Sequence, residues 1–268
     1  MTRQGRVATV LLGVILWVGL VSHAGATASQ PGGEVVVLAA ASLTGAFTDM
    51  ARDLRGAHPR LRIVYNFAGS QALRTQLEQG AAADVFASAN TEQMQRALDR
   101  GLIAGLPQVF VRNSLLIIVP RANPGQVTSF EDLAKRGLKL TLAGPQVPAG
   151  SYSRETLRAA QADYGTDFAE RVLRNLVSEE TSVRQVLVKV QLGEADAGIV
   201  YASDVSEKVL QDVNTLSIPD AHNRLASYPI AAAQAARNPS GAAAFIRFVL
   251  SPPGQAILKA HGFIPVTE

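Results

Sequence analysis

From residue 35 onward, short runs of β-branched residues alternate with longer segments whose apolar residues recur at helical spacing. Val35–Ala40 predicts a buried strand, and Thr44–Leu54, which follows, repeats its apolar residues with the period of a helix. The alternation continues through Arg62–Phe67, Ala72–Gln79 and Asp84–Ser88 as strand, helix and strand. Such a pattern is typical of α/β folds, in which helices cover a sheet.

The same alternation extends to the end of the chain. Val109–Val119 predicts one long strand that ends at Pro120, and three polar residues have a Gln or Glu at the third following position, as in helix capping boxes: Asn90, Thr128 and Ser182. The other expected elements are strands at Lys139–Ala143, Ala197–Tyr201, Thr215–Ile218 and Leu225–Ala232, and helices at Phe130–Arg136, after Ser151, at Ser240–Leu250 and at Pro253–His261. Because no flexible linker interrupts the series, the chain must cross between any two lobes as strands.

Residues 1–28 have the composition of a secretory signal peptide. Arg3 and Arg6 precede the apolar run Val7–Val21, and small residues after it offer cleavage sites in the stretch 24–28. A retained membrane anchor is the alternative, but it needs about 17–25 apolar residues and this run has 15. No cysteine follows the run, which excludes a lipoprotein. The mature chain is therefore expected to be periplasmic or secreted.

Composition excludes several classes of function. The chain has no cysteine, which rules out thiol catalysis, thiolate-bound zinc and iron–sulfur clusters. Its 25 Lys and Arg residues are mixed with 22 Asp and Glu residues, so no basic stripe for nucleic acid is expected. Common hydrolase, kinase and dinucleotide motifs are absent, and His58, His222 and His261 lie in polar or turn-forming stretches. A serine hydrolase with a spatially assembled triad remains an alternative.

Four strands or turns end in small residues immediately before a helix. These are Ala39–Thr44, Phe67–Ser70, Val147–Gly150 and Thr181–Val183. A helix N-terminus carries unpaired N–H groups and about half a positive charge, and small residues let an anion approach the backbone. Since strand ends collect at one edge of an open α/β sheet, the four turns could converge on an anion. Ordinary capping is the competing explanation for each turn taken alone.

Six short motifs, in this order, resemble the periplasmic molybdate-binding proteins of ABC importers. They are AAASLT (39–44), FAGS (67–70), ADVFASA (83–89), VPAG (147–150), TSVR (181–184) and GIVYASD (198–204). The resemblance covers about Glu34 to Pro265. One departure lies at Gly69 and Gln71, where many members have serine or threonine.

The resemblance implies a two-lobed type II periplasmic binding protein, each lobe a mostly parallel sheet flanked by helices, with the ligand in the cleft between them. The first lobe would comprise residues 34–113 and 226–268, and the second residues 114–225. The implied oxyanion ligands are the hydroxyl and N–H groups of Ser42 and Ser70, the N–H groups of Ala149 and Val183, and the hydroxyl of Tyr201. No cofactor and no directly bound cation are implied.

Molybdate and tungstate are dianions without protons at neutral pH, so hydrogen-bond donors alone suit them. Hydrogen phosphate needs an acceptor for its proton, and sulfate is smaller, so the same donors would be stretched toward it. The expected function is capture of molybdate, and of tungstate, by a monomer that delivers it to the membrane permease of an ABC importer. A carrier of another oxyanion such as sulfate is the alternative. Whether Arg74 or Arg184 assists binding stays open.

Overall fold

The computed structural model describes residues 1–2 and 31–266. All but the first two residues of the expected signal peptide lie outside the described residues. In the described part of the chain, no helix has both the length and the apolar character that a membrane span requires.

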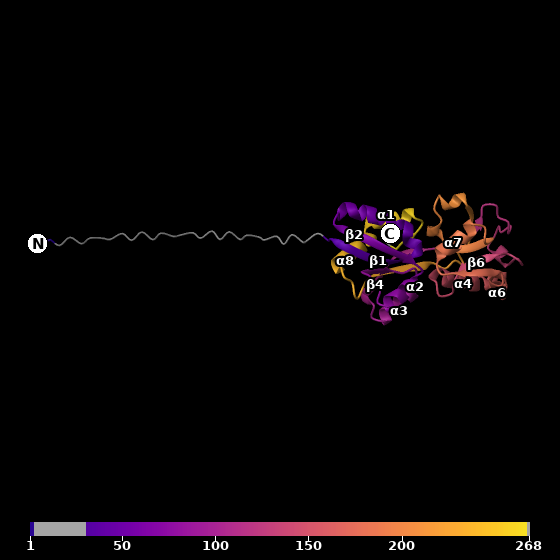
Figure 1. Cartoon of the computed structure of the whole chain (residues 1–268), viewed down its shortest axis with the longest axis horizontal. Helices are drawn as coiled ribbons and strands as arrows, with labels where there is room; N and C mark the ends of the chain where they lie inside the picture. Colours follow the sequence, from indigo (N-terminus) through magenta and orange to yellow (C-terminus); the bar gives the residue numbers. More distant parts are fainter. Residues whose placement is uncertain (3–30, 267–268) are drawn as a thin grey trace.

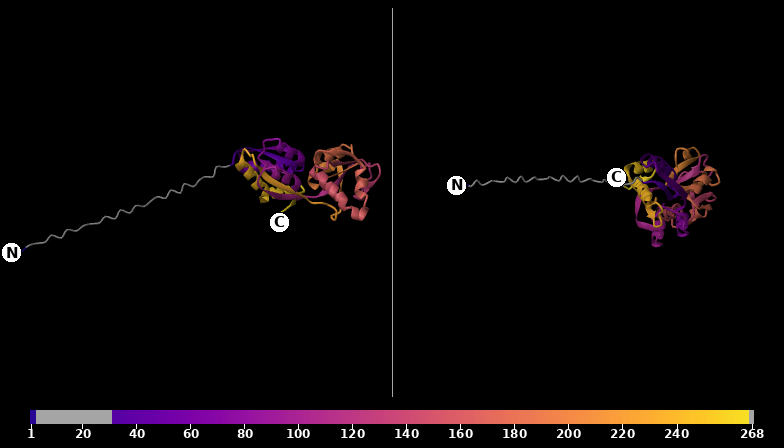
Figure 2. Two further views of the ribbon diagram at one scale, coloured as in Figure 1. Left: turned by 90° about the horizontal axis from the view of Figure 1, so that it is seen from below. Right: turned by 60° about the vertical axis from the view of Figure 1, so that its left-hand side comes forward.

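The described chain forms two lobes that lie side by side, each built on one sheet (Figures 1 and 2). The first lobe contains β1 (Gly33–Ala40), β2 (Leu61–Ala68), β3 (Val85–Ala87), β4 (Ile103–Asn113), β10 (Ala226–Ala233), β11 (Ile264–Pro265), the 3-10 turn η1 (Ala41–Leu43), α1 (Thr44–Ala57), α2 (Ser70–Glu78), α3 (Thr91–Asp99), α8 (Pro239–Leu250) and α9 (Pro252–Ala260). The second contains β5 (Leu115–Pro120), β6 (Leu140–Ala143), β7 (Leu176–Glu180), β8 (Ala197–Tyr201), β9 (Val213–Ser217), α4 (Pro148–Ala159), α5 (Gln161–Tyr164), α6 (Phe168–Leu173), α7 (Val183–Gln191) and the 3-10 turns η2 (Glu131–Ala134), η3 (Ala202–Asp204) and η4 (Val209–Gln211).

Both sheets are mixed rather than mostly parallel. The order in the first lobe is β11-β4-β10-β3-β1-β2, and only β1 pairs in parallel, with β2 and β3. The order in the second is β7-β6-β8-β5-β9, where β6 pairs in parallel with β7 and β8 while β5 runs antiparallel to both neighbours. In the first lobe β10 runs against its neighbours β3 and β4, and in the second lobe β5 runs against β8 and β9; both reversed strands adjoin a crossing between the lobes.

The apolar run expected to form one strand, Val109–Val119, is two strands in two different sheets. β4 starts earlier, at Ile103, and ends at Asn113, whereas β5 starts at Leu115. Both strands have the same two-residue period, so periodicity carries no signal at the change of sheet. The polar triplet at 112–114 is the local mark of the break, and the carbonyl of Ser114 accepts the N–H of Ala202 there.

The expected capping boxes form only in part. Asn90 accepts the N–H of Gln93, but the Gln93 side chain turns away from the cap and accepts a hydrogen bond from Arg74 at 2.8 Å. At Thr128 the acceptor is Asp132 instead of Glu131, and the following helix is only the short η2. The N–H of Asn90 donates instead to the Ser88 hydroxyl at 3.3 Å, and that of Thr128 to the Asp132 carboxylate.

The third expected box fails at Ser182, whose side chain makes no cap hydrogen bond. Gln185 accepts the N–H and the hydroxyl of Thr181 instead, at 2.9 and 2.7 Å. α7 nevertheless begins at Val183, as the pattern predicts.

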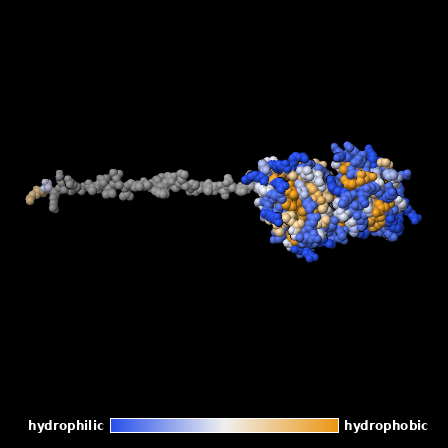
Figure 3. Space-filling model, viewed as in Figure 1, coloured by the Kyte–Doolittle hydropathy of each residue, from blue (hydrophilic) through white to orange (hydrophobic). Residues whose placement is uncertain are grey.

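β1 distributes its side chains between two apolar layers. Val35 and Val37 pack with α1 and α8, whereas Leu38 packs with α2 and α3 on the other face. The larger layer is continuous with the core of the second lobe, so buried apolar side chains extend across the junction. Most of the face shown in Figure 3 is polar, with apolar residues gathered in separate patches on each lobe.

Candidate functional site

A small cavity lies at the junction of the lobes, where strands of both sheets end. Strands β1, β2 and β8 end beside the cavity, and helices α2, α4 and α7 begin there. Its lining residues are Ala40, Ala41, Ser42, Ala68, Gly69, Ser70, Ala89, Val147, Pro148, Ala149, Val183 and Tyr201. All carry small or apolar side chains except the two serines and the tyrosine, so the backbone itself forms much of the wall.

The structure brings together all five residues singled out from the sequence. Ser42 lies in η1 and Ser70 is the first residue of α2, both in the first lobe. Ala149 lies in the first turn of α4, Val183 is the first residue of α7, and Tyr201 ends β8, all in the second lobe.

α4 begins at Pro148, three residues before the expected start near Ser151. Proline favours the first helical position because its fixed φ suits the helix and its missing N–H has no partner there in any case. The N–H of Ala149 therefore belongs to the first helical turn, where amides have no partner within the helix.

The site presents unpaired backbone donors in a buried place. The N–H groups of Ser70, Ala149 and Val183 have no acceptor within the described residues, and these residues are at most 4% exposed. Buried amides without partners are rare, because each lost hydrogen bond costs about 1–3 kcal/mol. Three of them around one cavity indicate a site for an electron-rich ligand.

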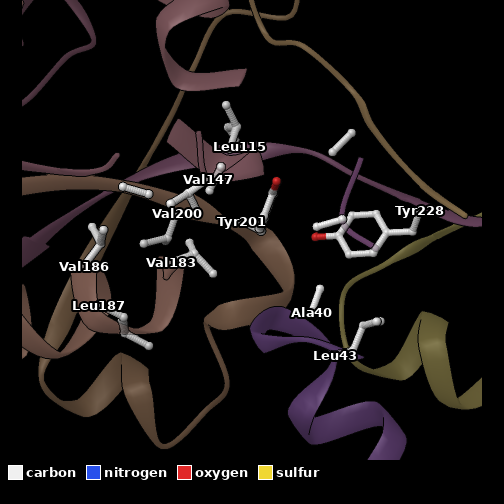
Figure 4. Packing of buried hydrophobic residues seen from close by; sticks show 14 of the residues in the cluster. Ala40, Leu43, Leu115, Val147, Val183, Val186, Leu187, Val200, Tyr201 and Tyr228 are labelled. Carbon is white, nitrogen blue, oxygen red and sulfur yellow. The ribbon is translucent and has the colours of Figure 1, made fainter. Parts of the chain in front are cut away.

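The Tyr201 hydroxyl is a fourth unpaired donor. Its oxygen is buried and, within the described part of the chain, has no hydrogen-bond partner. Burial raises the pKa of this phenol well above its ordinary value, so the group keeps its proton at neutral pH. Figure 4 shows Tyr201 beside Tyr228, and the two rings meet edge to face with centroids 5.8 Å apart.

The serine hydroxyls have protein partners behind them. The Ser70 oxygen accepts the backbone N–H of Ala89 at 3.0 Å. The Ser42 oxygen is 2.9 Å from the hydroxyl of Tyr228, which also accepts a hydrogen bond from the Asn113 amide at 3.3 Å. Neither serine has an imidazole or carboxylate within hydrogen-bond distance in the described structure, so no general base is in place to activate either as a nucleophile.

Direct contacts between the lobes close the cavity. The Gln71 side-chain amide donates to the carbonyl of Thr181 at 2.9 Å, and that of Gln93 donates to the carbonyl of Gln146 at 3.4 Å. At Gly69 an added Cβ would lie 2.4 Å from the same Thr181 carbonyl oxygen. The backbones of the two lobes therefore meet at this edge with no room for a side chain.

The two arginines left open by the sequence do not line the cavity. Arg74 is bound to Gln93 and forms an ion pair with Glu78. Arg184 follows Val183, and its Nε is buried without a partner within the described residues. Burial raises the pKa of nearby Asp204 to about 7, and the Arg184 charge acts in the opposite direction. Asp204 accepts the N–H of Tyr201 at 3.2 Å, which fixes the backbone that carries the phenol.

Sequence reasoning missed Tyr228 and Asn113. Both are fully buried, and they lie in β10 and β4, the strands that flank the two crossings between lobes. Nothing in the local pattern distinguishes them from core strand residues, because their partners are distant in sequence. Ser42 and Tyr228 are 186 positions apart.

The sequence matches the family model described as bacterial extracellular solute-binding protein, over residues 35–264. The chain belongs to this family. Membership indicates a binding protein rather than an enzyme. The molybdate-binding protein ModA of Mycobacterium tuberculosis is 38% identical over 263 residues, which cover 96% of this chain and 97% of that protein. ModA of Escherichia coli is 32% identical over 240 residues, covering 86% and 89%.

Solved structures of this fold superpose over most of the chain. The periplasmic molybdate-binding protein of Azotobacter vinelandii has a TM-score of 0.75 at 20% identity and covers 86% of this chain and 98% of its own. The sulfate-binding protein SubI of M. tuberculosis has a TM-score of 0.80 at 16% identity, covering 87% of each. These likenesses confirm the expected type II periplasmic binding protein fold.

Proposed function

We propose that this protein captures molybdate, and also tungstate, outside the cytoplasm and delivers it to an ABC importer. The observation that carries the proposal is the buried cavity between the lobes, whose polar groups are amide N–H and hydroxyl groups from both lobes. The relatives named ModA support molybdate as the ligand.

The chemistry of the wall favours a small dianion that carries no proton. The cavity is far smaller than the roughly 300–1,000 Å³ of pockets for drug-sized organic ligands. The lining contains no carboxylate and no basic side chain. Each charge-assisted hydrogen bond contributes about 1.5–3 kcal/mol, so several together offset the cost of dehydrating the ion.

Ligand groups from two lobes make the anion a bridge that favours closure. In this proposal the lobes, residues 34–113 with 226–268 and residues 114–225, separate when the ion leaves. The importer's permease then recognises the closed form. The mature protein acts as a monomer without a cofactor or lipid anchor, after removal of the signal peptide.

A thermal-shift panel of oxyanions tests the function. At a ligand concentration one hundred times Kd, linkage adds about 2.7 kcal/mol to the free energy of unfolding. For a protein of this size this raises Tm by roughly 5–10 °C. We expect that shift with molybdate and tungstate and little with sulfate or phosphate at equal concentration. A sulfate shift as large as the molybdate shift would contradict the proposal and favour a sulfate carrier.

Tyr201→Phe should weaken molybdate binding by roughly 10- to 100-fold, because it removes one charge-assisted hydrogen bond and keeps the buried ring. The free energy of unfolding without ligand should change little, since the hydroxyl has no protein partner to lose within the described residues. Calorimetric titration with molybdate measures the first effect and urea unfolding the second. Unchanged affinity would show that the phenol does not bind the ion.

A further inference from the structure

Three helix starts give the cavity a positive potential. Helices α2, α4 and α7 begin beside it, and none of the three has an acidic residue in its first turn. Each helix start carries about half a positive charge, so the three together supply roughly 1.5 charges against the two of a dianion. The backbone dipoles alone therefore do not balance the full charge of such an ion.

Helix α7 also carries a cation in its first turn. Arg184 is the second residue of this helix and directly follows Val183, whose unpaired N–H adjoins the cavity. A cation at a helix start is repelled by the helix dipole, which favours acidic residues there and basic residues at the other end. Arg184 thus occupies a position that is unfavourable in the empty protein and becomes favourable when an anion is bound.

Within the described residues, Arg184 forms no ion pair, and its Nε is buried without a hydrogen-bond partner. Two other arginines near the cavity are neutralised, Arg74 by Glu78 and Arg154 by Glu179. Partial burial of a guanidinium without a bonded counter-ion costs free energy. A dianion in the cavity would supply the missing negative charge.

Asp204 is the acidic residue whose charge acts on Arg184, although the two are not bonded. It is buried in η3, where it accepts the N–H of Tyr201, and its Oδ1 has no partner in the described structure. Both α7 and η3 pack against η1, which carries Ser42, so both charges belong to elements that surround the cavity. Burial raises the pKa of Asp204 to about 7, while the Arg184 charge lowers it. At neutral pH this carboxyl therefore cancels the Arg184 charge only in part.

We infer that Arg184 is a specificity-determining residue that favours doubly charged oxyanions over singly charged ones of the same shape, through its charge and without contact to the ion. The inference rests on the proposed function, since it concerns the same cavity. Arg184 does not line that cavity. Coulomb energy is proportional to the charge of the ligand, so the guanidinium attracts a dianion twice as strongly as a monoanion at the same place. Size alone cannot separate two such ions.

Arg184→Gln tests the inference, because it removes the charge and keeps a polar side chain. Kd is measured at pH 8 by calorimetry, directly for molybdate and by competition for perrhenate, a tetrahedral monoanion of similar size. We expect the variant to raise the molybdate Kd about tenfold and the perrhenate Kd only about threefold, since halving the ligand charge halves the Coulomb energy. Perrhenate thus reports a charge effect that a defect in packing would not produce.

Three further variants separate charge from shape. Arg184→Lys keeps the charge and should bind both ions within about twofold of the wild type. Arg158→Gln is the matched control, since it removes an exposed arginine from the last turn of α4, and it should leave both Kd values unchanged.

Asp204→Asn removes the opposing negative charge, while an asparagine oxygen can still accept the N–H of Tyr201. At pH 8, where Asp204 is mostly ionised in the wild type, this variant should lower the molybdate Kd about threefold or more. The opposite direction of this change keeps the test available if Arg184→Gln fails to fold.

Equal factors for molybdate and perrhenate in Arg184→Gln would overturn the inference, because a change of shape acts on both ions alike. Wild-type molybdate affinity in folded Arg184→Gln would also overturn it, as would Arg184→Lys binding as weakly as Arg184→Gln. Wild-type protein that binds no molybdate would instead overturn the proposed function, which the first titration establishes before any variant is compared.

Discussion

Gly69→Ala is expected to weaken molybdate binding by about tenfold or more while the protein stays folded. The added Cβ would lie 2.4 Å from the carbonyl oxygen of Thr181, a backbone atom of the opposite lobe. The lobes then approach less closely, and the contacts of the second lobe to the ion, from the N–H groups of Ala149 and Val183 and the hydroxyl of Tyr201, lengthen. Loss of one charge-assisted hydrogen bond of about 1.5 kcal/mol or more corresponds to this loss of affinity.

The backbone at Gly69 adds no strain of its own, because its φ of −60° and ψ of 138° suit any residue. Calorimetry with molybdate and urea unfolding without it measure the two expectations. Gly56→Ala, in α1 with open space around the new methyl group, is the matched control and should bind as the wild type does. Wild-type affinity in Gly69→Ala would show that the closed contact at Thr181 is not needed for binding.

The new methyl group would also meet the Gln71 side chain at 2.5 Å. That side chain can move, so the double change Gly69→Ala with Gln71→Ala separates the two contacts. If the loss comes from the Thr181 backbone, the double variant stays weak. Recovery of affinity would assign the clash to Gln71.

Val183→Pro should weaken molybdate binding by about 100-fold or more. Proline removes the N–H that faces the cavity, leaves an oxygen of the dianion without its donor and places a ring carbon where the amide hydrogen was. The position tolerates proline, because Val183 is the first residue of α7 and the preceding Ser182 is extended, with φ −152° and ψ 158°.

Val183→Ala is the control, since it keeps the amide and shortens the buried side chain. It should bind molybdate within a few fold of the wild type, and both variants should unfold at similar urea concentrations. If Val183→Pro bound as well as Val183→Ala, the backbone amide at this helix start would not contact the ion. Arg184, next along the helix, would then be the better candidate.

Local patterns in the sequence predict this fold well, because most of its strands and helices are amphipathic or bounded by strong turn residues. β1, α1 and β8 begin and end close to their expected positions. The prediction of one strand at Val109–Val119 was wrong. The side chains of β4 and β5 alternate with the same period, and only the pairing of each strand in its own sheet separates the two. The prediction that both sheets are mostly parallel was wrong for a similar reason. The direction of β10 depends on where the chain re-enters the first lobe, which no local pattern records.

The candidate site, too, could be predicted from the sequence only in part. Small residues before helix starts, together with the family resemblance, predicted a role for Ser42, Ser70, Ala149 and Val183. All four line the cavity between the lobes. Tyr228 could not be found this way, because its role depends on a hydrogen bond to a residue in another element of the fold.

Crystals of the mature protein grown with molybdate, with diffraction recorded at a wavelength where molybdenum scatters anomalously, test the central proposal most directly. We expect one strong anomalous peak in the cavity between the lobes. Its oxygen atoms should lie within about 3 Å of the hydroxyls of Ser42, Ser70 and Tyr201 and of the N–H groups of Ala149 and Val183. A peak at any other place on the protein, or no peak under conditions where titration shows binding, would contradict it.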